Sequence, residues 1–339
     1  MKITIYVAIL LLFWTGIRCT RQEAANAKST VAQPVTADTV KAEPAKPLLD
    51  TAHYDTLIRQ LANGDTTGKW PVKAPRPLPG AVLPFNRVVA YYGNLYSKRM
   101  GILGELPKAQ LLQKLKGEVA KWEAADSLTP VIPALHYIAV TAQSRPGKGN
   151  KYRLRMPFHQ IDTILNWSKE IDALTFLDIQ VGHSNIRTEV HELEPYLKMP
   201  TVHLGIDPEF SMKTGARPGA KIGTYDASDI NDVIDTLAKI VQENNIPPKI
   251  LVIHRFTQGM ITNYKNIKKV PEVQIVIDMD GFGSRILKES TWLRYIYREP
   301  VQFTGFKIFY YNDSKGNHKI YTPEELLKFR PKPIYIQYQ

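Results

Sequence analysis

Residues 202–255 contain a strand, a helix and a second strand in succession. The apolar run VHLGID occupies positions 202–207, SDINDVIDTLAKIVQEN occupies 228–244, and ILVIHR occupies 250–255. In the middle segment the apolar residues recur three and four positions apart, as they do on the buried face of a surface helix. Alternation of apolar strands with such helices is typical of parallel βα units. The stretch therefore predicts an α/β fold.

The same alternation extends from residue 85 to the end of the chain. We expect eight strands, at residues 88–92 (VVAYY), 131–140 (VIPALHYIAV), 174–181 (LTFLDIQV), 202–207, 250–255, 273–278 (VQIVID), 306–311 (FKIFYY) and 334–337 (IYIQ). A second surface helix is expected at 108–125, and the capping-box sequence TPEE at 322–325 predicts the start of a short helix. Eight strands in about 250 residues fit a single closed (β/α)8 barrel of the TIM type. A doubly wound open sheet is the alternative, but residues 91–94 (YYGN) lack its Gly-rich phosphate turn.

The first residues are typical of a secretory signal. Lys2 supplies positive charge, residues 3–14 form an apolar run, and small and polar residues follow. The run is too short for a helix that spans a bilayer of roughly 30 Å. Cys19 occupies the place of the acylated cysteine in a bacterial lipoprotein, and simple cleavage nearby is the alternative. We therefore expect residues 1–19 to be a signal peptide and the protein to be exported to the periplasm or cell surface, with a membrane lipid anchor if Cys19 is acylated.

Residues 20–84 are expected to form a linker. Their first half is rich in Ala, Thr, Lys and Pro without apolar periodicity, which is typical of a disordered tether. A short helix is expected at 53–62, followed by a Pro-rich stretch at 71–84. The barrel would then occupy residues 85–339. Since Cys19 is the only cysteine, the barrel has no disulfide.

Polar residues at the predicted strand ends are the candidates for a site, because a (β/α)8 barrel carries its active site at the carboxyl ends of its strands. The expected catalytic residues are Asp178, Asp207, Glu209 and Asp278, and the expected substrate-binding residues are Tyr91, Tyr92, His136, Lys148, Arg217, His254 and Asp280. Asp207 and Glu209 would point the same way if both lie on one strand. Crowded carboxylates separate each other's pKa values, so that one serves as acid and another as base. Each such residue could instead be a helix N-cap or a core histidine.

Metal binding is the rival interpretation of the same residues. Asp178, Asp207, Glu209, His254, Asp278 and Asp280 offer oxygen and imidazole ligands that suit Mg²⁺, Mn²⁺, Ca²⁺ or Zn²⁺. No compact ligand motif such as His-Glu-x-x-His occurs. The sequence prediction therefore assigns no metal and no cofactor, and a phosphodiesterase or deacetylase is the chemistry that a metal would favour.

The net charge of the chain indicates what kind of partner it could bind. The formal net charge is +12, and two Gly-containing basic loops, residues 145–151 and 213–221, follow the second and fourth predicted strands. Loops of this kind can bind an anion through charge and backbone N–H groups. A basic surplus also occurs in exported proteins for solubility alone. No basic helix or recognised module predicts nucleic-acid binding.

The run Asp207-Pro208-Glu209 resembles the Asp-x-Glu signature of chitinase-like and lysozyme-like barrel hydrolases. The resemblance to lysozyme-like muramidase barrels extends to residues 136–137 (HY) and 336–338 (IQY), where that family often has Trp-Gln-Tyr. His203 and Gly205 depart from the chitinase pattern, which has aspartates there. More broadly, residues 91–338 resemble a family of bacterial exported barrel proteins without an assigned activity.

The resemblance implies a glycoside-hydrolase-like barrel that acts on a cell-envelope or environmental polysaccharide. Glu209 would be the general acid, and Asp207 or Asp278 would be the base, nucleophile or stabiliser. Two alternatives stay open: a non-catalytic envelope protein that binds an anionic glycan, and a metal-dependent hydrolase.

Overall fold

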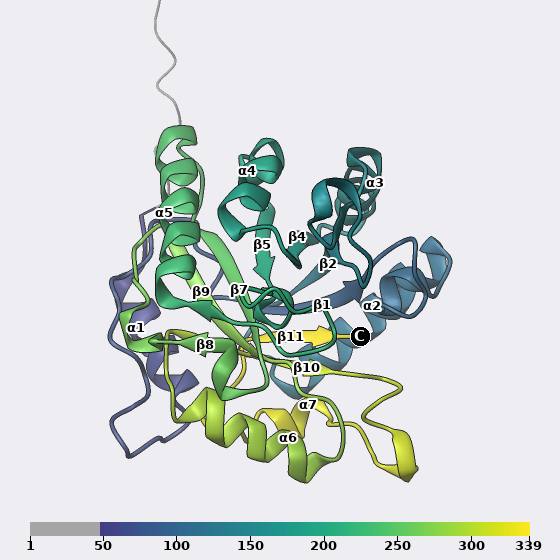
Figure 1. Cartoon of the computed structure of the whole chain (residues 1–339). Helices are drawn as coiled ribbons and strands as arrows, with labels where there is room; N and C mark the ends of the chain where they lie inside the picture. The colour runs from purple at the N-terminus through teal and green to yellow at the C-terminus, as the bar shows by residue number, and fades with distance from the viewer. Residues whose placement is uncertain (1–47) are drawn as a thin grey trace, which may run out of the picture. The chain divides into compact units, whose positions relative to one another are not determined.

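The computed structural model describes residues 48–339 of the chain (Figure 1). The predicted signal peptide, Cys19 and the first half of the predicted linker lie outside the described residues. Within the described part, no helix is both long and apolar enough to cross a membrane.

Eight parallel strands form a closed barrel, which confirms the predicted (β/α)8 fold. They are β1 (Arg87–Gly93), β2 (Val131–Ala142), β4 (Leu174–Ile179), β5 (Val202–Ile206), β7 (Lys249–Arg255), β9 (Val273–Met279), β10 (Phe303–Ile308) and β11 (Tyr335–Tyr338). Each strand pairs with the next, and β1 closes the barrel because it pairs in parallel with both β2 and β11. All eight predicted strands are present.

Three short strands lie outside the barrel. The strand β3 (Arg153–Arg155) pairs antiparallel with the end of β2, so the loop after β2 folds back as a hairpin. A two-stranded parallel sheet joins β6 (Tyr225–Asp226) to β8 (Ile261–Thr262). Both additions belong to loops that follow barrel strands.

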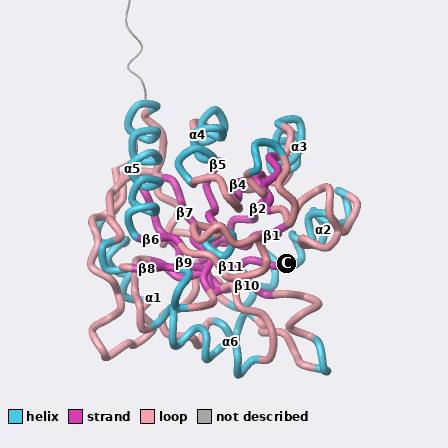
Figure 2. Tube along the Cα trace, viewed as in Figure 1, coloured by secondary structure: helices cyan, strands magenta, loops and turns pink. Residues whose placement is uncertain are grey.

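Helices surround the barrel (Figures 1 and 2). They are α2 (Lys108–Ala125), α3 (Phe158–Lys169), α4 (Ile186–Leu197), α5 (Ala227–Asn244), α6 (Arg285–Thr291) and α7 (Pro323–Leu326). The two predicted surface helices match α2 and α5 to within one residue. The predicted capping box is present at α7, because the Thr322 side chain accepts from Glu325 N and the Glu325 side chain accepts from Thr322 N.

Short helical turns connect these elements. Six are 3₁₀ turns, η1 (Ile102–Gly104), η2 (Lys148–Asn150), η3 (Pro208–Phe210), η4 (Gln258–Met260), η5 (Tyr264–Asn266) and η7 (Lys315–Asn317). The helix α6 continues as a π-helical turn, η6 (Trp292–Tyr297). Of these turns, η3 is the one that carries a predicted catalytic residue.

Alternation along each strand divides the apolar core in two. One side chain set packs outward against the helices, and the other packs inside the barrel. The inner apolar set lies toward the start of the strands and includes Leu83, Phe176, Ile250, Val276 and Phe303. Gln274 and His203 are buried polar side chains at this level, whereas the carboxylates of the interior lie toward the carboxyl ends of the strands.

Residues 48–84, assigned to a linker from the sequence, contact the amino-terminal end of the barrel. The helix α1 (Thr51–Leu61) corresponds to the short helix expected at 53–62. The backbone N–H of Leu83 donates to Gln274 Oε1 at 3.1 Å, and Gln274 Nε2 donates back to Leu83 O at 2.5 Å. Lys332 N donates to Leu61 O at 2.8 Å. The segment is held here because Leu83 fills the open end of the barrel.

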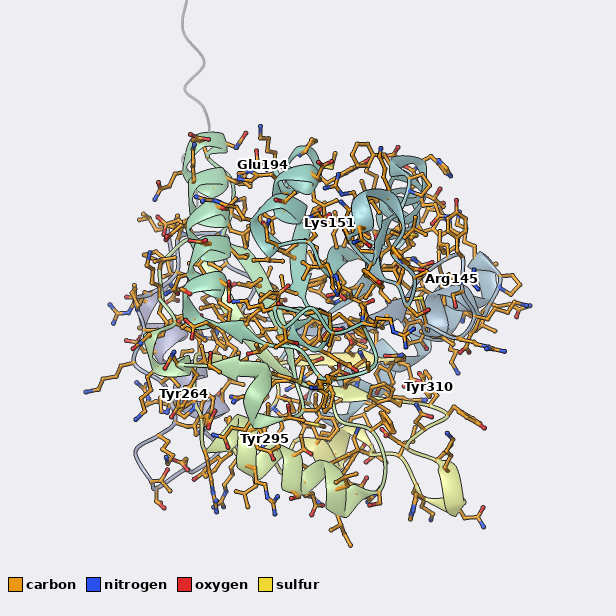
Figure 3. All side chains as sticks on the ribbon, in the orientation of Figure 1. Arg145, Lys151, Glu194, Tyr264, Tyr295 and Tyr310 are labelled. Carbon is orange, nitrogen blue, oxygen red and sulfur yellow. The ribbon has the colours of Figure 1, made fainter. Side chains whose placement is uncertain are left out.

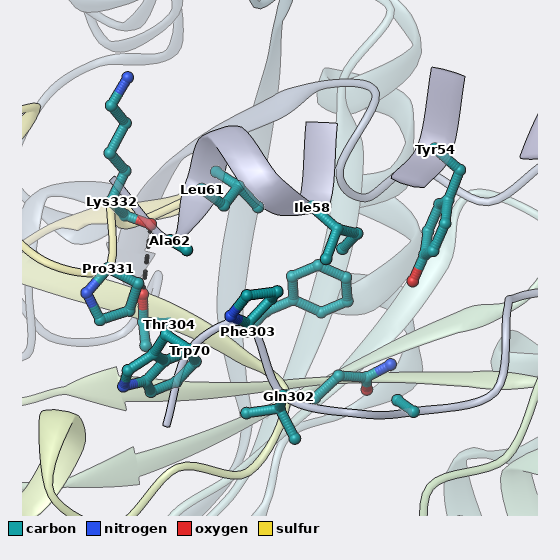
Figure 4. Close-up of a pocket in the computed structure, with 13 residues that line it drawn as sticks. Tyr54, Ile58, Leu61, Ala62, Trp70, Gln302, Phe303, Thr304, Pro331 and Lys332 are labelled. Atoms are coloured by element: carbon teal, nitrogen blue, oxygen red, sulfur yellow. Dashed lines mark hydrogen bonds between the residues drawn. The ribbon is translucent and has the colours of Figure 1, made fainter. Parts of the chain in front are cut away.

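The void that remains between α1 and the barrel is small (Figure 4). Tyr54, Ile58, Trp70 and Phe303 are among its lining residues, and its volume is about 20 Å³. That volume accommodates about one water molecule. This end of the barrel is therefore a packed base.

Candidate active site

A buried polar layer crosses the barrel above the apolar base. It is formed by His136 on β2, Asp178 on β4, His254 on β7 and Asp278 on β9, none of which is exposed. Asp178 Oδ1 lies 3.3 Å from His136 Nε2 and 3.3 Å from His254 Nε2. His254 Nδ1 lies 3.5 Å from Asp278 Oδ2. Four strands therefore bring two imidazoles and two carboxylates together at the barrel axis.

Further residues enclose this layer. The Tyr92 hydroxyl donates to Asp178 Oδ2 at 3.0 Å. His136 Nδ1 lies 2.6 Å from the Tyr335 hydroxyl and 3.1 Å from Gln337 Nε2. These contacts fix the orientation of the His136 ring.

Two glycines make room for the layer. A Cβ at Gly205 on β5 would lie 2.3 Å from both Asp178 Oδ1 and His136 Nε2, and a Cβ at Gly305 on β10 would lie 2.6 Å from Asp278 Oδ1. No side chain fits at these distances. At position 205 the chitinase pattern has an aspartate. A side chain has no room there in this protein, because Asp178 and His136 occupy the space that its Cβ would take.

A cavity of about 640 Å³ opens above the layer. Its polar lining includes Tyr92, Gln180, Asp207, Glu209, Asp280 and Lys307. Its apolar lining includes Met100, Phe210, Phe256, Phe282 and Phe309. The volume lies in the range of small-molecule sites, and the combination of an apolar wall with a few convergent polar groups is typical of them.

Asp207 and Glu209 both line this cavity, although they do not share a strand. The strand β5 ends at Ile206, and Pro208 starts the turn η3 that carries Glu209. Asp207 is the N-cap of that turn, and its Oδ1 accepts from Glu209 N at 3.0 Å. The expectation of two carboxylates on one strand was thus wrong, because proline at 208 favours a turn. Asp207 is therefore both a helix N-cap, which was the alternative predicted for such residues, and a lining residue of the cavity.

The carboxylates of the cavity have different pKa values. Burial, reinforced by the charge of Asp280, raises the pKa of Glu209 to about 7. Burial also raises the pKa of Asp207 well above its ordinary value. For Asp280 burial acts in the same direction, but Lys307 and His254 outweigh it and lower the pKa. The cavity therefore contains a protonatable Glu209 and an ionised Asp280.

Lys307 supplies the cation at this site. Its Nζ lies 2.9 Å from Asp280 Oδ1 and 3.9 Å from the centre of the Tyr92 ring. Its side chain is 3% exposed, so this ion pair is shielded from water. Lys307 was not among the predicted site residues. It could have been recognised as the one charged residue inside the predicted strand FKIFYY at 306–311.

Not every predicted residue lies at the cavity. Tyr92, Asp207, Glu209 and Asp280 line it, whereas Asp178, Asp278, His136 and His254 form the buried layer beneath. Tyr91 points the opposite way from Tyr92 and packs in the outer core, where its hydroxyl lies 3.1 Å from that of Tyr310. Lys148 and Arg217 are both exposed and are not among the lining residues.

The basic loops therefore have no direct part in the cavity. Arg145 and Lys151, labelled in Figure 3, belong to the loop that carries Lys148. A hairpin holds this loop: Arg153 Nε and Arg155 Nε each donate to the carboxylate of Glu189, at 2.9 and 2.7 Å. Glu189 is fully buried, so its carboxylate anchors the hairpin to α4.

A second buried ion pair supports the loops after β9 and β10. Lys288 Nζ lies 2.8 Å from Asp313 Oδ2 and donates to Gly281 O at 2.8 Å and Lys307 O at 2.7 Å. Asp313 accepts from Gly283 N and Phe309 N at 2.8 and 3.0 Å. The pair therefore fixes the backbone on both sides of Asp280 and Lys307.

The fold and the site together define a (β/α)8-barrel protein with a carboxylate-lined cavity at the carboxyl ends of its strands. No known family profile matches the chain. No curated protein sequence matches it either.

Several solved structures are similar in part. They include dihydropteroate synthase of Burkholderia cenocepacia, at 8% identity and a TM-score of 0.35 over 79% of this chain and 92% of that one. The mannanase BCman of Bacillus subtilis matches at 10% identity and 0.35 over 75% and 80%. A sugar phosphate isomerase/epimerase from Parabacteroides distasonis matches at 10% identity and 0.32 over 79% and 90%. At these values the likenesses carry no inference about activity.

Proposed function

We propose that this protein is a glycoside hydrolase in which Glu209 is the general acid and Asp280 is the second carboxylate. Its substrate would be a polysaccharide of the cell envelope or the environment, in line with the predicted export of the chain. This chemistry needs no metal and no organic cofactor.

The observation that carries the proposal is the difference in protonation between the two carboxylates. A glycosidase needs one carboxylic acid to protonate the leaving oxygen and one carboxylate to assist at the sugar carbon. Because the pKa of Glu209 is about 7, this residue holds a proton near neutral pH and can release it during bond cleavage. Asp280 remains ionised beside Lys307 and His254.

Asp280 replaces Asp278 in the role expected from the sequence. Asp278 lies in the buried layer and is not among the cavity-lining residues. A substrate in the cavity would therefore contact Asp280 and not Asp278. Asp207 remains a stabilising group because it caps η3 and so orients Glu209. The phenylalanines of the wall offer faces for sugar rings.

The test is release of reducing ends from peptidoglycan, chitin and mannan by the full-length protein. We expect turnover of at least one of these polymers, and a loss of about a thousandfold in kcat/KM for both Glu209→Gln and Asp280→Asn. Glu105→Gln, on the exposed side of the η1 turn, is a control that should retain full activity.

Two outcomes contradict the proposal. The first is full activity in the Glu209→Gln variant. The second is saturable binding of a glycan by the native protein with no turnover, which supports a non-catalytic binding protein.

A further inference from the structure

We propose that His136, Asp178 and His254 form a binding site for a single divalent transition-metal ion, with Zn²⁺ as the ion of best chemical fit. The site lies in the buried polar layer beneath the cavity. This inference goes beyond the proposed glycosidase chemistry, which needs no metal. The two proposals share His254, whose Nδ1 lies 3.1 Å from Asp280 Oδ2, and the experiments below distinguish them.

The first argument is the distance between the donor atoms. Asp178 Oδ1 lies 3.3 Å from the Nε2 atoms of both histidines, and the three atoms lie within 4.8 Å of one another. A hydrogen bond between a nitrogen and a carboxylate is usually shorter, at about 2.8 Å. Ligand atoms on a tetrahedral ion with bonds of about 2.0 Å are about 3.3 Å apart. The two distances from Asp178 Oδ1 therefore match those between ligands of one ion, and the third pair of donors lies within 4.8 Å.

The second argument is the support behind each donor group. A metal-binding histidine commonly contacts a carboxylate or another polar group through its second nitrogen, which fixes the ring. His254 Nδ1 lies 3.1 Å from Asp280 Oδ2, and His136 Nδ1 lies 2.6 Å from the Tyr335 hydroxyl. The second oxygen of Asp178 accepts from Tyr92. Asp178 is thus held by a hydrogen bond and His136 contacts Tyr335, while His254 lies beside the Asp280 carboxylate, and each group has one donor atom near those of the others.

The third argument is an excess of buried negative charge. Asp178 and Asp278 are fully buried, and Asp280 is nearly so. Lys307 lies beside Asp280, whereas neither oxygen of Asp278 has a hydrogen-bond partner among the described residues. The nearest cationic group to Asp278 is His254 Nδ1, at 3.5 Å from Oδ2, which is longer than a good charge-assisted hydrogen bond, and a weakly compensated buried carboxylate is costly. A divalent cation in the layer would offset this charge.

A fourth observation concerns Gln337. Its Nε2 donates toward His136 Nδ1, while its buried Oε1 has no hydrogen-bond partner among the described residues. Rotation of the amide would place the oxygen where it accepts from the Tyr335 hydroxyl or from a protonated His136 Nδ1. When Nδ1 of the neutral His136 ring carries the proton, Nε2 has a free lone pair, as metal binding requires.

The experiment measures metal binding directly, on full-length protein stripped with a chelator. The protein is loaded with Zn²⁺ or Co²⁺, passed through a desalting column and analysed for bound metal. We expect one equivalent of zinc, and visible absorption bands of low-symmetry cobalt in the Co²⁺ form. The cobalt spectrum needs no variant, so it stays informative if a variant fails to fold.

The variants are His254→Gln and a matched control, His203→Gln. His203 is also buried inside the barrel, but it lies outside the cluster and its Nδ1 accepts from Ile250 N at 3.0 Å. We expect His254→Gln to weaken zinc binding by at least about a hundredfold, and His203→Gln to bind as the native protein does.

Failure to retain metal in the native protein, or equal affinity in native and His254→Gln protein, would overturn the inference. In that case the layer is a hydrogen-bonded network of histidine and aspartate. The Glu209→Gln variant is expected to retain its metal. Loss of activity with retained metal therefore separates the hydrolase proposal from this one.

Discussion

Gly205 on β5 lies directly against Asp178 on β4. The two residues are register partners in adjacent strands, and a Cβ at position 205 would lie 2.3 Å from Asp178 Oδ1. The backbone of Gly205 does not have a positive φ, so the glycine is needed for space. The absence of one side chain thus lets a carboxylate reach the barrel axis.

The variant Gly205→Ala is expected to lower the free energy of unfolding by about 3 kcal/mol, because either Asp178 or a strand must move to admit the methyl group. Chemical denaturation measures this change. Gly117→Ala is the control: Gly117 is exposed in α2, and, apart from its own helix backbone, no atom lies within 4 Å of the position that its Cβ would take. Alanine there should stabilise the protein by up to about 1 kcal/mol. Equal effects of the two substitutions would contradict the packing argument.

The raised pKa of Glu209 makes stability depend on pH. The native state holds a proton on this group between its ordinary value of 4.5 and about 7, where the unfolded chain has lost it. The stabilisation is complete below the unfolded value and is lost as the pH rises through about 7. We expect this contribution to reach roughly 2 kcal/mol, after allowance for partial exposure.

Urea denaturation of native and Glu209→Gln protein, at about pH 5 and about pH 8, checks this dependence. The native protein should lose more stability than the variant over this interval. Parallel losses in the two proteins would show that Glu209 does not titrate in the expected range.

Lys307→Met tests the cation of the cavity. Without Lys307 the pKa of Asp280 should rise, because burial then acts with less opposition. If Asp280 must be ionised for activity, the acid limb of the pH–activity profile should move up by about one unit or more. Lys239→Met, at an exposed ion pair on α5, should leave the profile unchanged. An unmoved acid limb in Lys307→Met would exclude Asp280 as the titrating group.

Glu189→Gln tests the anchor of the hairpin after β2. The substitution removes a buried charge that two arginines and Ser184 contact, and we expect a loss of about 3 kcal/mol or more. Glu192 also pairs with Arg155, but its side chain is 43% exposed. Glu192→Gln should therefore cost less than about 1 kcal/mol. Thermal unfolding of both variants compares the two, and similar losses would contradict the role of burial.

The positions of the barrel strands were predictable from local sequence, with one instructive shift. The seventh predicted strand, at 306–311, is β10 at Phe303–Ile308. Thr304 and Gly305 have weak apolar character, and pairing with β9 makes them strand residues. Conversely Tyr310 and Tyr311 extend an aromatic run past the end of the strand. Apolar patterning identifies a strand well, but the neighbouring strand decides where it starts and ends.

The depth of each polar residue in the barrel was not predictable in the same way. The sequence places Asp278 at the end of a predicted strand and Asp280 two residues beyond it, yet Asp278 is sealed in the layer and Asp280 reaches the cavity. Their heights depend on the stagger between neighbouring strands, which is a property of the closed barrel. Lys307 was missed for the same reason, since only the barrel brings it to Asp280.

Local periodicity and composition were enough to predict the eight strands, the helices α2 and α5 and the carboxylate-rich strand ends. That Tyr92 faces the interior and Tyr91 faces the helices follows only from the folded barrel, since alternation along a strand fixes opposite directions but not which one is inward. The folded barrel also shows that Glu209 and Asp280 share a cavity and that His136, Asp178 and His254 share a centre. These residues come from strands that are far apart in the chain, and only closure of the barrel brings their side chains together.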